Sequence, residues 1–214
     1  MSASFPNGTV FAIGSTYGAN ITISAVSNAN PGIATAAAHG LTDTDIILLA
    51  MPSRLDGKVV RVDAPATGSF ALEGVNTTST TLYPSGFGVG TAKEITAWTS
   101  LSQVVDSQSA GGEQQFYQWV YLEDGRQRQR PTFTNARSMT LTMDYDPALS
   151  WHQALLDRAI ANEVSGLRAT LPSGALIYWG VYVGYDGEPT FTINENQKVT
   201  LSLSLASTNQ RYAS

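Results

Sequence analysis

The sequence predicts a mainly β protein: a β-sandwich or barrel with one amphipathic α-helix, plus an inserted small β domain. Three observations predict this fold class. In the closing stretch, Val199, Leu201, Leu203 and Leu205 alternate with Thr and Ser, as in a strand with one buried face. Clusters of Gly, Asn, Asp and Pro separate similar stretches elsewhere. One stretch late in the chain has helical spacing instead.

Short strands are expected along most of the chain. They are predicted over residues 10–13, 21–26, 46–51, 59–62, 70–72, 95–98, 116–122, 139–143, 176–185, 191–193 and 199–205. Asp124 and Gly125 lie between the aromatic strand 116–122 and the charged stretch 126–130. Because both positions of an Asp-Gly pair tolerate positive φ, a two-residue turn and a long hairpin are expected there.

The helix is expected at about residues 147–165. Asp146 suits the N-cap, Pro147 suits the first helical position, and Gly166 suits the left-handed residue that follows a helix. The apolar residues at helical spacing are Leu149, Leu156, Ile160 and Val164, with Trp151 and Leu155 one step round the helix. A helix with this pattern packs its apolar face on a sheet.

Composition excludes several classes of function. With 12 Lys and Arg against 17 Asp and Glu, the 214 residues carry a formal charge of −5, and the cations are scattered. Binding to nucleic acid needs clustered cations, so it is not expected. The absence of cysteine excludes disulfides and thiolate chemistry. Residues 1–42 hold no Asp, Glu, Lys or Arg, but Pro, Gly and Asn interrupt them, so neither an export signal nor a membrane span is expected.

A change in composition divides the chain. Residues 21–92 contain short strands and end in an uncharged run rich in Gly, Ser and Thr, 74–92. Its glycines at 86–90 alternate rather than following a phosphate-binding spacing, and suit a linker. The whole stretch is typical of a small β module with flexible ends. Residues 1–20 and 93–214 are then expected to form a second, larger domain into which the module is inserted.

No group of residues assembles a catalytic or metal site. His39, with Asp43 and Asp45 after it, suits a turn better than a metal loop. His152 lies on the predicted helix and has no paired acid for catalysis. Asp144 and Asp146 could be imagined as the acid pair of a glycoside hydrolase, but they suit a strand end and a helix cap. The prediction is a protein that is not an enzyme and needs no cofactor or metal.

The most informative charges are Arg126, Arg128 and Arg130, which lie on one face of a predicted strand with glutamines on the other. Like charges in a row repel, so these side chains should face solvent or the acids of a partner. Two interpretations stay open: an edge strand that its charges protect from aggregation, and a contact between subunits. The neighbouring Glu123 and Asp124 argue against a grip on nucleic acid.

Several motifs follow one another in a familiar order. Gly111-Gly112-Glu113 leads into a strand and the turn Glu123-Asp124-Gly125, and the Asp-capped helix precedes a strand that ends in Leu171-Pro172-Ser173-Gly174. This order resembles the tail tube proteins of bacteriophages with long, non-contractile tails. The module resembles small β domains common in phage tail proteins. That second resemblance rests on residues 21–24, 38–41, 45–47, 55–62 and 70–78.

The resemblance implies a virion structural protein, the major tail protein of a siphophage, which self-assembles into stacked hexameric rings and lets DNA pass without binding it specifically. The implied partners are further copies of the chain and the tape measure, tail terminator and tail-tip proteins, with no membrane insertion. The implied location is the virion tail, after assembly in the host cytoplasm. Glu123, Asp124, Arg126, Arg128 and Arg130 are the candidate subunit interface. The alternative is a tail-associated binding module, or adhesin, that recognises a surface glycan.

Overall fold

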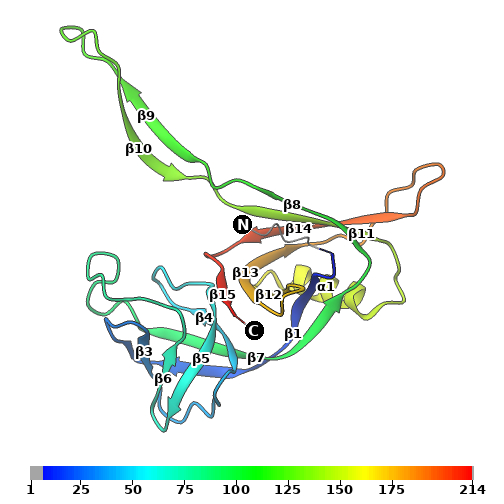
Figure 1. Ribbon diagram of the computed structural model, residues 1–214, viewed down its shortest axis with the longest axis horizontal. Helices are drawn as coiled ribbons and strands as arrows, with labels where there is room; N and C mark the ends of the chain where they lie inside the picture. Colours follow the sequence, from blue (N-terminus) through cyan, green and yellow to red (C-terminus); the bar gives the residue numbers. More distant parts are fainter. Residues whose placement is uncertain (1–6, 214) are drawn as a thin grey trace.

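The computed structural model describes residues 7–213, which form fifteen strands and one helix (Figure 1). The elements are β1 (Val10–Ile23), β2 (Ala25–Val26), β3 (Gly32–Thr35), β4 (Ile46–Ala50), β5 (Val59–Ala66), β6 (Ser69–Leu72), β7 (Gly90–Leu101), β8 (Val104–Ala110), β9 (Gln114–Trp119), β10 (Arg128–Thr134), β11 (Ser138–Asp144), α1 (Ser150–Ala161), β12 (Ser165–Thr170), β13 (Leu176–Gly184), β14 (Lys198–Leu205) and β15 (Gln210–Tyr212). The predicted mainly β fold with a single helix is confirmed. The first six residues of the stretch where no export signal is expected lie outside the described part.

Thirteen strands form one continuous antiparallel sheet, in the order β2-β3-β6-β5-β4-β7-β1-β12-β13-β14-β11-β8, with β15 paired to β13. The long strands β1 and β7 lie in its middle and pair along their length, from Phe11 opposite Leu101 to Ile23 opposite Gly90. They run from one half of the molecule into the other (Figure 1). Within residues 7–213, no helix is both long and apolar enough for a membrane crossing.

The buried side chains form two large hydrophobic cores and one small cluster between them. The first core is built from residues between Ile23 and Ala92, and the second from Ile13 and residues between Leu101 and Leu203. The small cluster joins strands of both halves; it consists of Leu48, Val59, Ile95, Tyr178 and Tyr212. In β14, Val199, Leu201 and Leu203 are buried while the hydroxyl residues between them are exposed, as the period of two predicts.

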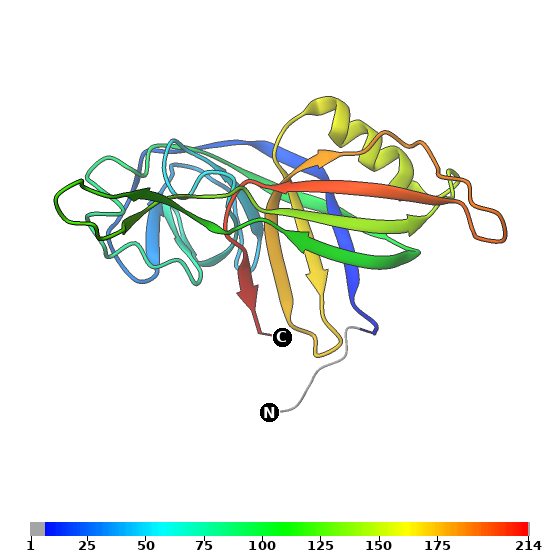
Figure 2. The ribbon, with the colours of Figure 1, turned by 90° about the horizontal axis from the view of Figure 1, so that it is seen from above.

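The helix lies against one face of the sheet that surrounds the second core (Figure 2). It is shorter than predicted, because Asp146 and Gly166 do not cap it. Asp146 accepts a hydrogen bond from the Ala148 amide at 3.0 Å in a turn before the helix, and Leu149 is the N-cap residue. At the other end, Asn162 takes the left-handed conformation, with φ of 51°.

Gly166 lies inside β12, where a Cβ atom would collide with the Ile95 side chain. The prediction of its role was therefore wrong: this glycine allows close packing and does not end the helix. The predicted apolar face was also wrong in part. Trp151 and Leu155, one helical turn apart, are the buried residues of α1, whereas Ile160 is 82% exposed because it lies on the opposite side of the helix, away from the core.

Three other predictions about segments need correction. Residues 191–193 do not form a strand, and Phe191 and Ile193 are exposed. Residues 86–90 are not a loose linker: Phe87 belongs to the first core, and at Gly88 a Cβ atom would collide with Val26. Three strands were not predicted. They are β3, β8 and β15.

The carboxyl end of the chain fastens the two halves together through Tyr212. Its hydroxyl accepts a hydrogen bond from the Arg61 amide at 2.9 Å and donates one to the Glu73 carbonyl at 3.1 Å. The Arg61 guanidinium lies 4.5 Å from the centre of the Tyr212 ring and also pairs with the Glu73 carboxylate. On the other side, Tyr212 packs against Tyr178 of β13. One residue of the second half thus completes a polar cluster of the first.

Candidate assembly surface

A long hairpin, the arm (residues 111–137), projects from the sheet (Figure 1). At its root, β8 pairs with β11 from Ser138 opposite Ala110 onwards. Beyond them, β9 and β10 form a separate two-stranded sheet. All seven residues of β10 and four of the six in β9 are exposed. A two-stranded hairpin is at best marginally stable in water, so this one gains little stability from burial within its own chain.

Two glycines set the direction of the arm at its root. Gly111 and Gly112 have φ of 82° and 87°, a region that other residues rarely adopt. A Cβ atom on Gly111 would collide with the backbone carbonyl of Ala136 on the returning strand, whereas a Cβ atom on Gly125, at the tip, would meet nothing within 4 Å. Of Gly111 and Gly125, only Gly111 is required both by its backbone conformation and by the lack of space for a side chain.

Replacing Gly111 by alanine should therefore loosen the arm, while Gly125→Ala, which also has positive φ, is the matched control. We expect Gly111→Ala to cost about 1–3 kcal/mol locally, because the backbone must shift, and Gly125→Ala to cost about 1 kcal/mol or less. Amide hydrogen exchange of β9 and β10 should accelerate in the first variant only. Equal exchange rates in both variants would show that Gly111 does not hold the arm.

The tip of the arm is wider than the sequence predicted. The last cross-strand pair is Trp119 opposite Arg128, so eight residues, 120–127, form the connecting loop instead of a two-residue Asp-Gly turn. Asp124 and Gly125 do lie at the turn, where their amides both donate to the Tyr121 carbonyl.

The register places the arginines among aromatic residues. Arg128 and Arg130 face Trp119 and Tyr117 across the ladder, on one face of the hairpin, and those two aromatic rings stack at 5.8 Å. Arg126, by contrast, lies in the tip loop and not on the strand. The prediction of three arginines on one strand face was therefore wrong, and only Arg128 and Arg130 share that face. The opposite face pairs Phe116 with Pro131 and Gln118 with Gln129.

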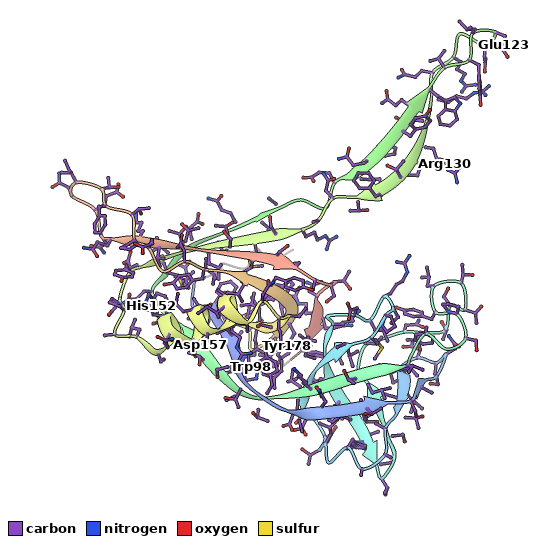
Figure 3. All side chains as sticks on the ribbon, turned by 180° about the vertical axis from the view of Figure 1, so that it is seen from behind. Trp98, Glu123, Arg130, His152, Asp157 and Tyr178 are labelled. Atoms are coloured by element: carbon purple, nitrogen blue, oxygen red, sulfur yellow. The ribbon has the colours of Figure 1, made fainter. Side chains whose placement is uncertain are left out.

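The charged side chains of the arm differ in whether they have partners. Arg128 forms an ion pair with Asp124 and lies 5.3 Å from the centre of the Tyr121 ring. Among the described residues, the side chains of Arg126, Arg130 and Glu123 have no ion-pair or hydrogen-bond partner. Figure 3 shows Glu123 at the tip of the arm and Arg130 further down it. Exposed large apolar side chains accompany them; they are Phe116, Tyr117, Val120, Tyr121, Leu122 and Phe133.

A second segment projects from the molecule, and the sequence did not single it out. This acidic loop (residues 186–197) joins β13 to β14, and residues 190–197 are all exposed. Its base is ordered, because the Thr190 amide donates to the Lys198 carbonyl at 2.8 Å and Gly187 lies close to His152 of α1. The signal that could have identified it is the run of turn-forming residues on both sides of Phe191 and Ile193.

The other candidate residues have structural partners. His39 contacts the Ala66 carbonyl at 2.7 Å and accepts from the Leu41 amide at 3.1 Å. His152 lies 2.7 Å from the Tyr185 hydroxyl, where burial raises the pKa of Tyr185 to about 12. Asp144 accepts a hydrogen bond from Asn196. Within residues 7–213, no three His, Asp or Glu side chains gather in a way that could hold a metal ion.

Comparison with known proteins gives a family. No curated protein matches the sequence. One similar solved chain belongs to the virion of a native gene transfer agent particle; it shares 11% identity, covers 54% of this chain and 89% of its own length, and superimposes with a TM-score of 0.40. The family model for phage tail tube proteins matches residues 50–214, about three quarters of the sequence. The chain belongs to the phage tail tube protein family.

Proposed function

We propose that this tail tube protein self-assembles into stacked hexameric rings that form a conduit for DNA in the tail of a siphophage. The observation that carries the proposal is the arm. It carries six large apolar side chains, and its own chain leaves half or more of each one exposed. In a ring or stack, further copies of the same chain supply that cover. The role is structural, and no step of catalysis is needed for it.

Charge fits a conduit better than a binding channel. Each chain carries −5, so six copies would carry −30. A wall with this charge repels phosphate, and without clustered cations it gives DNA nothing to bind. DNA would slide past it. The tape measure, tail terminator and tail-tip proteins would meet the ends or the inside of such a tube, in the virion tail after assembly in the host cytoplasm.

We also propose that the chain divides into a larger domain, residues 1–20 and 93–214, and an inserted module, residues 21–92. The two separate hydrophobic cores support this division. Hydrogen exchange is the test, because two units with separate cores should protect their amides to different degrees. A single common protection level would contradict the division.

Microscopy tests the proposed self-assembly directly. The purified chain, concentrated and followed by light scattering and negative-stain electron microscopy, should form rings or tubes with a central channel. A chain that stays monomeric at high concentration, alone and with its tail partners, would contradict the proposal. If such a monomer bound a surface glycan on an array, the alternative role of a tail-associated adhesin would replace it.

A further inference from the structure

We propose that the arm of one copy docks on the acidic loop of the next copy, so that the tube grows by a head-to-tail contact between these two projections. This inference rests on the proposed self-assembly and names the surface that receives the arm. The two segments lie at opposite ends of the molecule, and the views from the front and from above agree on this (Figures 1 and 2). Within one chain they cannot meet.

The charges of the two segments are complementary. The acidic loop contains Asp186, Glu188 and Glu195 and no cation; Glu195 pairs only with Lys198, just outside the loop. The carboxylate of Glu188 has no partner among the described residues. On the arm, Arg126 and Arg130 likewise lack carboxylate partners. Opposite charges placed this way favour one docking register and disfavour others.

The apolar side chains are complementary too. Phe191 and Ile193 of the acidic loop are 75% and 89% exposed, and the arm exposes Tyr117 and Phe133 at 63% and 65%. Both segments therefore present apolar surface that a contact would cover, beside unpaired arginines on the arm and an unpaired glutamate on the acidic loop. Burying these side chains between copies would remove apolar surface from water and so favour the contact.

Another acidic loop of the chain is less suitable as the receiving surface. His39, Asp43 and Asp45 lie in the first half, but residues 38–45 expose no large hydrophobic side chain, and Asp45 is already bonded to the amide and hydroxyl of Thr42. A contact between two different surfaces, arm to acidic loop, repeats without closing on itself in pairs. That is the geometry a growing tube requires.

Charge reversal on each side tests the contact. The arm variant is Arg126→Glu with Arg130→Glu, and the loop variant is Glu188→Lys with Glu195→Lys. Each variant alone places like charges together, which should reduce the sedimentable tube mass about tenfold or more. Mixed in equal amounts, the two variants should polymerise again, because each reversed arm now meets a reversed loop. A single chain carrying all four changes should also polymerise.

Controls separate the outcomes. Asp43→Lys with Asp63→Lys makes the same change in net charge as the loop variant, at exposed positions of the first half, and should leave tube mass unchanged. Circular dichroism should show every variant folded. If the wild-type chain assembles, either of two results would overturn the docking contact alone. In the first, the arm variant and the loop variant both assemble normally; in the second, assembly recovers neither in their mixture nor in the four-change chain. A wild-type chain that never assembles would instead contradict the proposed function.

Discussion

Replacing Trp151 by alanine should lower the free energy of unfolding by about 3–5 kcal/mol, the usual cost of removing a large aromatic side chain from a core. Trp151 is 1% exposed and lies in the second core with Leu155, Leu141 and Leu167. It also meets Tyr185 and His152 edge-on. Loss of the indole would leave a cavity under the helix that the surrounding strands cannot close. Urea denaturation followed by far-UV circular dichroism measures the change.

Two companion variants sharpen this prediction. The Trp151 indole nitrogen is buried and has no hydrogen-bond partner among residues 7–213, so Trp151→Phe removes an unpaired donor and keeps a ring. We expect it to cost less, about 1–2 kcal/mol. Ile160→Ala, on the exposed side of the same helix, should change stability by about 0.5 kcal/mol or less. Equal losses at positions 151 and 160 would mean that the helix packs by the face the sequence predicted.

The sequence predicted the parts of this fold in which side-chain pattern and burial agree. In β14 the alternation is complete, and the burial follows it residue by residue. By contrast, β8 is exposed along almost its whole length. A strand exposed on both faces has no apolar alternation, so no periodicity can reveal it. In β12, Gly166 has the sequence signature of a helix stop but is needed for packing against Ile95.

The candidate surface was predictable only in outline. Arg128 and Arg130 were correctly placed on one strand face, because neighbouring positions two apart share a face. Which aromatic residues they face depends on the register between β9 and β10, and the length of the tip loop sets that register. The turn preference of Asp124 and Gly125 predicts a shorter loop than the one observed. The position of residues 186–197 at the end opposite the arm is a property of the whole sheet. No local sequence pattern can predict that position.

Replacing Tyr212 by alanine should unfasten the two halves of the molecule and lower stability by about 3–5 kcal/mol. The side chain is 4% exposed, and its loss removes both the packing on Tyr178 and the partner of the Arg61 amide and the Glu73 carbonyl. Tyr212→Phe keeps the ring but leaves those two backbone groups unpaired, which should cost about 1–3 kcal/mol. Tyr182→Phe, at an exposed tyrosine, is the matched control and should have almost no effect.

Alkaline pH should reproduce part of this loss in the wild-type protein. Burial raises the pKa of Tyr212 from its ordinary value of 10 to about 12, so folding favours the neutral phenol. That contribution is fully present below pH 10 and is lost as the pH rises towards 12, at about 1.4 kcal/mol per pH unit for one such group. Burial also raises the pKa of Tyr17, Tyr178 and Tyr185, so four such tyrosines contribute in the wild type and three in Tyr212→Phe.

The variant should therefore lose stability less steeply than the wild type between pH 10 and 12, when both are measured by urea denaturation at each pH. Hydrogen exchange at pH 7 adds the structural part of the test. If Tyr212 fastens the halves, amides of β5 and β6 should exchange faster in Tyr212→Ala while those around Trp151 stay protected. Equal acceleration throughout would mean that the contact is part of one cooperative core, and that the two halves cannot be loosened separately.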